Sequence, residues 1–162
     1  MQLHNEINDF IQSCKSIILS TINLKKQVIC SYAPIIKIKD SFYIYISEIA
    51  EHFEGVKYNS ENIEIMFIED EQNTFSILAR KRLKFKVKTL EIERNNENFD
   101  YILEYYKKQN PQEEEIIKTI KNMQDFHLFK LVLKNGRYVK GFGKAYDINK
   151  EEIKLVDTKG HK

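Results

Sequence analysis

Residues Phe75 to Arg94 form a long run in which apolar and charged side chains alternate, and this run strongly limits the possible folds. Successive side chains of a β-strand point to opposite faces, so a period of two separates a buried face from a solvated one. The apolar face carries Leu83, Phe85 and Val87, and the other face carries Arg82, Lys84, Lys86 and Lys88. We therefore predict a long strand with a basic outer face.

Further runs rich in β-branched and aromatic residues predict neighbouring strands. Residues 16–22 and 27–35 are separated by a short polar segment, which predicts a hairpin. Residues 42–47 and the run around 63–68 predict two more strands. Between the runs 126–133 and 137–146 stands Asn135-Gly136, a pair that favours a tight hairpin turn because both turn positions need positive φ.

Three segments have helical character. Apolar residues recur every three or four positions from Leu3 to Cys14, as in an amphipathic helix. A short helix is predicted after the strand 42–47, with Ser47 as its cap and Gly55 as its end. Residues 95–123 are predicted to be helical, with Pro111 near a helix start.

Strands outnumber helices and follow one another closely. The expected fold class is mainly β with peripheral helices (α+β), built as a small antiparallel barrel. The length of 162 residues suits one domain, residues 1–162, that ends in a C-terminal tail.

Composition and motifs give no support for a nucleic-acid-binding protein, a membrane protein, a zinc protein or a hydrolase. The formal net charge of +2 gives no general argument for nucleic acid or an anionic membrane as partner. The N-terminus does not resemble a signal peptide, and no apolar run approaches the ~20 residues of a membrane span, so we expect a cytoplasmic protein. Cys14 and Cys30 are expected to be reduced core residues, and no zinc-site or hydrolase motif occurs.

A few polar residues are candidates for a site. Arg80 and Arg82 would share one face of the predicted strand, where they either form a solvated basic face or bind a phosphate, a carboxylate or an oxygen species on a cofactor. Asp125 and His127 would point the same way, as an ordinary strand start or as a carboxylate beside a ligand histidine. For His52, capping or packing is favoured over ligation.

Five stretches read in order carry a family resemblance: SYAPI, FYIYISEIAEH, IEDE with ARKRL, DFHLFKL and GRYVKGFGKAYDI. Together they resemble the haem-utilisation proteins of the HutZ/HugZ type, within the split-barrel family that includes pyridoxamine phosphate oxidase. The resemblance spans roughly Ile17 to His161. It implies a homodimer of split β-barrels that binds haem at the subunit interface and opens the ring to a biliverdin-type product with dioxygen and electrons. Such a protein would release iron and would need an electron donor, either ascorbate or a reductase.

The resemblance also implies roles for individual residues. His161 would bind the haem iron, and Asp125 would be hydrogen-bonded to that histidine across the dimer. Arg82 would face the open side of the iron. Arg80 or Lys81 would pair with a haem propionate, and His52 is counted with the cofactor-binding residues.

Two alternatives remain. The same His161 site would serve a non-catalytic haem carrier or storage protein. Alternatively, an FMN-dependent oxidoreductase of the same fold would place Arg80 and Arg82 around the flavin phosphate. The first hairpin turn, NLKKQ, lacks the Gly and Pro that flavin-binding relatives often carry there, which disfavours FMN.

Overall fold

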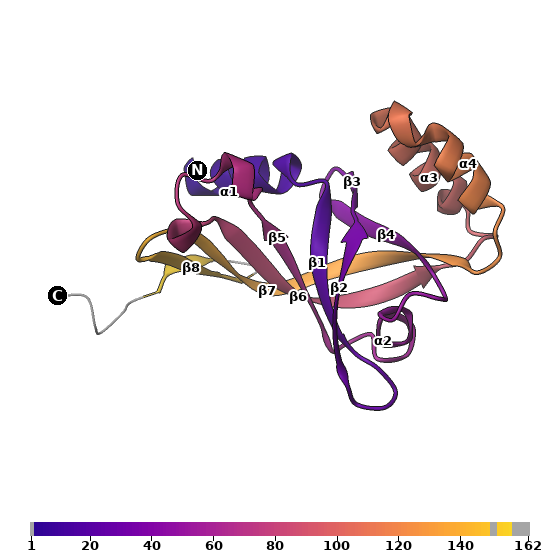
Figure 1. The fold of residues 1–162 in the computed structure, drawn as a ribbon, viewed down its shortest axis with the longest axis horizontal. Coiled ribbons are helices and arrows are strands. Elements are labelled where there is room, and N and C mark those ends of the chain that lie inside the picture. Colours follow the sequence, from indigo (N-terminus) through magenta and orange to yellow (C-terminus); the bar gives the residue numbers. More distant parts are fainter. Residues whose placement is uncertain (1, 150–151, 157–162) are drawn as a thin grey trace.

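A computed structural model of the chain describes residues 2–149 and 152–156. Its centre is an antiparallel sheet in the order β2-β1-β5-β6-β7-β4-β3, with β8 paired to β7 and β9 paired to β8 (Figure 1). The strands are β1 (Ser16–Ile22), β2 (Val28–Pro34), β3 (Ile36–Ile38), β4 (Ser41–Ser47), β5 (Ile63–Ile68), β6 (Arg82–Ile92), β7 (Phe126–Gly141), β8 (Lys144–Ile148) and β9 (Ile153–Leu155). The predicted α+β class and the hairpin of residues 16–34 are confirmed.

Strand β7 has different pairing partners at its two ends. One edge of β7 pairs with β6 along most of its length, whereas the other edge pairs first with β4 and later with β8. Phe126 is paired with Ser47 of β4, and Val139 is paired with Ala145 of β8. The two ends of β7 therefore belong to different parts of the molecule.

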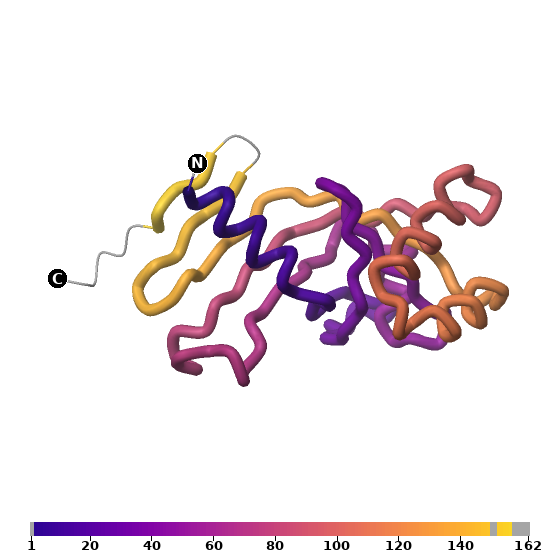
Figure 2. The backbone as a smooth tube through the Cα atoms, turned by 90° about the horizontal axis from the view of Figure 1, so that it is seen from above, coloured from indigo at the N-terminus to yellow at the C-terminus, as the bar shows by residue number. Residues whose placement is uncertain are grey.

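In the described part of the chain, four α-helices accompany the sheet: α1 (Gln2–Ser13), α2 (Phe53–Tyr58), α3 (Glu97–Gln109) and α4 (Glu114–Lys121). Helix α1 lies across the barrel on the side of β8, and the α3–α4 pair lies at the opposite end of the molecule (Figures 1 and 2). No helix in the described ranges is both long enough and apolar enough to cross a membrane.

The buried residues form two clusters. The larger joins the inner faces of the strands to α1 through Ile7, Phe10 and Ile11. The smaller joins α3 to β3 and β7 through residues such as Phe99 and Leu128. Burial of these apolar surfaces is the main stabilising contribution to the arrangement.

Two predictions about the strands are wrong. Residues 75–81 are not part of the long strand, because two short 3₁₀ turns, Glu71–Asn73 and Ile77–Ala79, precede β6. Asn135-Gly136 is not a hairpin turn, because β7 runs through it and the turn lies at residues 141–143. A Cβ at Gly136 would lie 2.4 Å from the ring of Phe85, so this glycine serves a close approach between β6 and β7.

Three local predictions also need correction. Ser47 ends β4 and does not cap a helix, and Gly55 lies inside α2, where a Cβ would lie 2.5 Å from Cβ of Thr21. Cys30 is exposed on β2 instead of buried. Cys14 is half-buried, and burial raises the pKa of its thiol.

Candidate functional site

A pocket of about 470 Å³ lies on the basic outer face of the sheet, and we call it the outer pocket. Its volume is within the range of small-molecule sites, about 300–1,000 Å³. It is lined by residues of β5 to β8 and of the segments beside them: Met66, Leu78, Arg82, Lys84, Arg137, Val139, Gly141, Phe142, Gly143, Lys144, Ala145 and Val156. The alternation of β6 positions Arg82 and Lys84 here, because Leu83 and Phe85 point into the core.

The basic residues of the outer pocket differ in their partners. Lys84 Nζ lies 3.1 Å from Glu64 Oε2. Arg137 donates from Nε to Asp147 Oδ1 at 2.7 Å and from Nη2 to Asp147 Oδ2 at 3.1 Å. Arg82 donates only to the backbone oxygen of Arg80, at 3.1 Å, and within the described part of the chain neither Arg82 nor Lys144 has a carboxylate partner. Two cations are thus available to a ligand.

The apolar part of the outer pocket is unusually exposed. Leu78 is 81% exposed and Phe142 is 75% exposed. Phe142 stands between Gly141 and Gly143 at the turn from β7 to β8, and the φ of Gly143, +69°, is one that glycine adopts without strain. Exposed apolar side chains grouped at a cavity are typical of a binding surface. Together with the free cations they suit a flat apolar ligand that carries negative charge.

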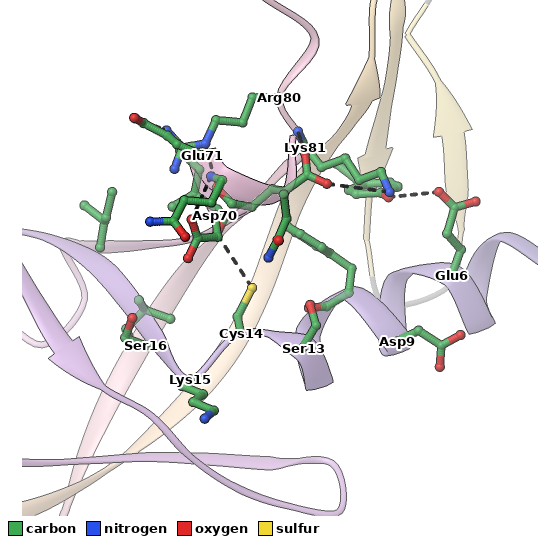
Figure 3. Close-up of a pocket in the computed structure, with 18 of the residues that line it drawn as sticks. Glu6, Asp9, Ser13, Cys14, Lys15, Ser16, Asp70, Glu71, Arg80 and Lys81 are labelled. Atoms are coloured by element: carbon green, nitrogen blue, oxygen red, sulfur yellow. Dashed lines mark hydrogen bonds and ion pairs between the residues drawn. The ribbon is translucent and has the colours of Figure 1, made fainter. Parts of the chain in front are cut away.

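Arg80 and Lys81 face a different cavity. This cavity, about 1360 Å³, lies between α1 and the segment after β5 (Figure 3). Arg80 donates from Nε to the backbone oxygen of Glu69 at 2.6 Å, and its Nη1 lies 2.7 Å from Glu71 Oε1. Lys81 Nζ lies 3.9 Å from Glu69 Oε1. The prediction that Arg80 and Arg82 share one face is wrong, because Arg80 follows a 3₁₀ turn and precedes the strand.

Several polar groups at this second cavity form hydrogen bonds or ion pairs within the chain. Tyr138 donates from its hydroxyl to Glu6 Oε1 at 2.9 Å, and Glu6 also pairs with Lys140. Burial and the neighbouring carboxylate raise the pKa of Tyr138. The thiol of Cys14 points to the backbone oxygen of Ile68 at 3.8 Å, as Figure 3 shows. These contacts tie α1 to the sheet, so we regard this cavity as structural.

Asp125 lies in the turn immediately before β7, at the strand start that the sequence predicted. Its Oδ2 accepts from Ser47 Oγ at 2.7 Å, and its backbone oxygen accepts from Glu48 N at 2.8 Å. His127 lies between two other carboxylates, with Nδ1 2.6 Å from Glu91 Oε1 and Nε2 2.8 Å from Glu48 Oε1. Of the two interpretations of this stretch, the ordinary strand start fits the described structure, because Asp125 and His127 do not pair with each other.

His52 is a buried packing residue, only 6% exposed, that immediately precedes α2. Its Nδ1 lies 2.7 Å from Ser31 Oγ, and it makes no side-chain cap. Burial lowers the pKa of its imidazole, so the neutral form is favoured. His52 is not among the residues that line the outer pocket. His161 lies outside the described residues.

Arg82 and Asp125 lie far apart within one chain. Arg82 is paired with Val139 near one end of β7, whereas Asp125 directly precedes Phe126 at the other end. Val139 lies thirteen positions after Phe126 in β7, and at about 3.3 Å per position this is roughly 40 Å along the strand. A site that uses both residues therefore needs two copies of the chain.

Comparison with known proteins places this architecture in a family. The family model of pyridoxamine 5'-phosphate oxidase matches residues 3–140. The chain belongs to this family. It is 33% identical over 152 residues to the haem oxygenase HutZ of Vibrio cholerae, a match that covers 94% of this chain and 84% of that protein. The family and the resemblance inferred from the sequence are confirmed.

Solved structures agree with this assignment. Campylobacter jejuni ChuZ has a TM-score of 0.91 and 46% identity, over 99% of this chain and 65% of that chain, so this chain spans less than two thirds of that relative. HutZ from Vibrio cholerae, there described as the haem storage protein, has a TM-score of 0.72 and 32% identity, over 83% of this chain and 92% of that chain. One relative thus carries two functional descriptions, an oxygenase and a storage protein.

Sequence reasoning missed two residues of interest, Lys144 and Ser47. Lys144 follows the turn of β7 and β8, and its place in the outer pocket depends on where that turn lies. Ser47 contacts Asp125 only because β4 pairs with the start of β7. Correct strand pairing would have revealed both residues.

Proposed function

We propose that this chain binds haem in the outer pocket and, as a homodimer, degrades it with dioxygen and electrons, releasing iron. The observation that carries the proposal is the combination of exposed apolar residues with Arg82 and Lys144, which have no carboxylate partner among the described residues. Haem is a flat apolar ring with two propionate groups, so it matches both features. The relatives named for haem support the same choice of ligand.

Individual residues would have separate roles in binding haem. Lys144 would pair with a propionate, a role we assign to it because Arg80 and Lys81 are engaged by Glu71 and Glu69. Arg82 would keep a permanent positive charge beside the ring, since guanidinium does not lose its proton in proteins. When bound, haem supplies the one-electron and dioxygen chemistry, and the protein supplies orientation and charge.

We further propose that His161 of one copy ligates the iron and that Asp125 of the other copy accepts a hydrogen bond from that imidazole. The distance between Arg82 and Asp125 along β7 supports an arrangement of two chains. A carboxylate that accepts the imidazole N–H raises the basicity of the ligand. Electrons would come from ascorbate or a reductase.

A carrier or storage function is the second candidate, because HutZ is also described as a haem storage protein. Binding in the outer pocket would be the same, and only turnover separates the two functions. The flavin alternative has less support, because it needs Arg80 and Arg82 around one phosphate and the two residues line different cavities.

A haem titration followed by reduction tests the proposal. The purified protein is mixed with one equivalent of haem, and ascorbate is added in air with catalase present to remove free peroxide. Loss of the Soret band with release of chelatable iron indicates the oxygenase. A stable Soret band indicates the carrier, and failure to bind haem contradicts both.

The histidine assignment is tested with a matched pair of variants. His161→Ala is expected to lose the tight haem complex while keeping the parent's unfolding midpoint, and His4→Ala on α1 serves as the control. Unchanged haem spectra in His161→Ala would contradict the assignment.

A further inference from the structure

Three backbone oxygens in the segment that carries Asp125, residues 121–126, accept hydrogen bonds from one arginine. Arg94 lies just after β6 and donates from Nη1 to the backbone oxygen of Lys121 at 2.7 Å. Its Nη2 donates to the backbone oxygens of Met123 and, at 2.9 Å, of Phe126. These carbonyls lie on both sides of Asp125, so the guanidinium fixes the backbone of the turn.

The same guanidinium is itself held in place. Its central carbon lies 5.2 Å from the centre of the Phe99 ring. The Tyr45 hydroxyl lies 3.4 Å from Arg94 Nη2 and donates to the backbone oxygen of Ile120 at 3.1 Å. Arginine suits this position because its donors form a rigid, planar set. The backbone of Asp125 is therefore fixed independently of its side chain.

The Asp125 side chain has one fixed oxygen and one available oxygen. Ser47 Oγ donates to Oδ2 at 2.7 Å, and Glu48 N donates to the backbone oxygen at 2.8 Å. In the described part of the chain, Oδ1 has no hydrogen-bond partner. With the backbone held by Arg94, the hydroxyl of Ser47 determines where Oδ1 points.

We propose that Ser47 is a positioning residue that orients Asp125 so that Oδ1 accepts the N–H of the haem-ligating imidazole. This inference rests on the proposed function, in which Asp125 is the partner of that imidazole. Without the serine hydroxyl, the carboxylate can rotate about a fixed backbone and spends less time in the productive orientation. The imidazole then donates less electron density to the iron.

Three variants test this role: Ser47→Ala, Ser47→Thr and Asp125→Asn. In each haem complex, resonance Raman spectroscopy measures the iron–histidine stretch of the ferrous form, and a redox titration measures the midpoint potential. Asp125→Asn is expected to lower the stretching frequency and raise the potential. Ser47→Ala should shift both in the same directions by a smaller amount, and Ser47→Thr, which keeps the hydroxyl, should restore both.

A matched control is Ser41→Ala at the other end of β4, which should leave both signals unchanged. A merely structural role for Ser47 would alter stability without moving the potential. If the parent binds haem and Ser47→Ala has the parent's frequency and potential, or shifts them in the opposite directions, the inference is wrong while the proposed function stands. If the parent does not bind haem, the proposed function and the inference both fail.

Discussion

The outer pocket and the Asp125 turn lie at opposite ends of β7, and their charged groups differ in the partners they have within the chain. At the turn, Arg94 has several acceptors within the chain, and Asp125 is bonded through its side chain and its backbone. At the outer pocket, Arg82 and Lys144 have no carboxylate partner among the described residues and stand beside exposed apolar side chains. The charge of Arg94, satisfied within the chain, stabilises the fold, whereas those of Arg82 and Lys144 are available to a ligand.

The comparison predicts its largest effect at Arg94. Arg94→Ala should lower the free energy of unfolding by about 2–4 kcal/mol, because hydrogen bonds from charged donors contribute about 1.5–3 kcal/mol each and the freed carbonyls are only partly rehydrated. Arg82→Ala should change it by no more than about 0.5 kcal/mol, as expected of a surface substitution. Urea unfolding of both variants measures the difference, and equal losses of stability would contradict the distinction between the two ends.

The second prediction concerns ligand binding at the outer pocket. The double variant Arg82→Ala/Lys144→Ala should bind haem about 10- to 100-fold more weakly, which corresponds to about 1.4 kcal/mol for each factor of ten. The double variant Lys25→Ala/Lys86→Ala removes the same charge from exposed positions outside the pocket and serves as the control. An equal weakening of haem binding in the two double variants, measured by absorbance titration, would show that net charge and not the pocket attracts the ligand. Unchanged binding in Arg82→Ala/Lys144→Ala would show that neither cation contributes to affinity.

Local patterns predicted the elements of the fold well, since most of them depend on short-range physics. The amphipathic period of residues 3–14 gave α1, and the alternation of Leu83, Phe85 and Val87 gave the buried face of β6. The hairpin turn predicted at Asn135-Gly136 was wrong, because a glycine required by a close neighbour looks the same in the sequence as a glycine required by a turn. Only the pairing of β7 with β6 distinguishes the two cases.

The site was predictable to a smaller extent, because it depends on contacts between distant segments. Arg82 was identified from the strand period, which extends only a few residues. The separation of Arg80 from Arg82 results from the 3₁₀ turn before β6, and no strong breaker marks that turn. The Ser47–Asp125 contact joins residues 78 positions apart, a relation that periodicity does not encode.

His52 shows that a buried polar atom without a hydrogen-bond partner does not always indicate a ligand site. Its Nε2 is buried without a partner in the described structure, yet the residue lies in the core and lines no described pocket. Burial lowers the pKa of the folded-state imidazole below its usual value of 6.5. The unfolded chain then binds more protons between the two pKa values, so this contribution to stability is present above about pH 6.5 and is lost as the pH falls through the folded-state pKa.

The predicted consequence is a difference in pH dependence. Between pH 7.5 and pH 5.5 the parent should lose more unfolding free energy than His52→Leu, which has no titrating group at this position. Urea unfolding at the two pH values measures both changes. A parallel pH dependence of parent and variant would show that protonation of His52 does not destabilise the folded state.

The smallest effect is predicted for a substitution of Asp147, which changes the charge of the outer pocket and leaves Arg82 and Lys144 in place. Asp147 holds Arg137 through two hydrogen bonds, and Arg137 lowers the pKa of that carboxyl. Asp147→Ala should release the guanidinium as a third cation for a propionate and raise haem affinity about two- to threefold. Because the pair is exposed and screened by solvent, the unfolding free energy should change little. Unchanged affinity would mean that haem is held by Arg82 and Lys144 alone, on the side of the pocket away from Arg137.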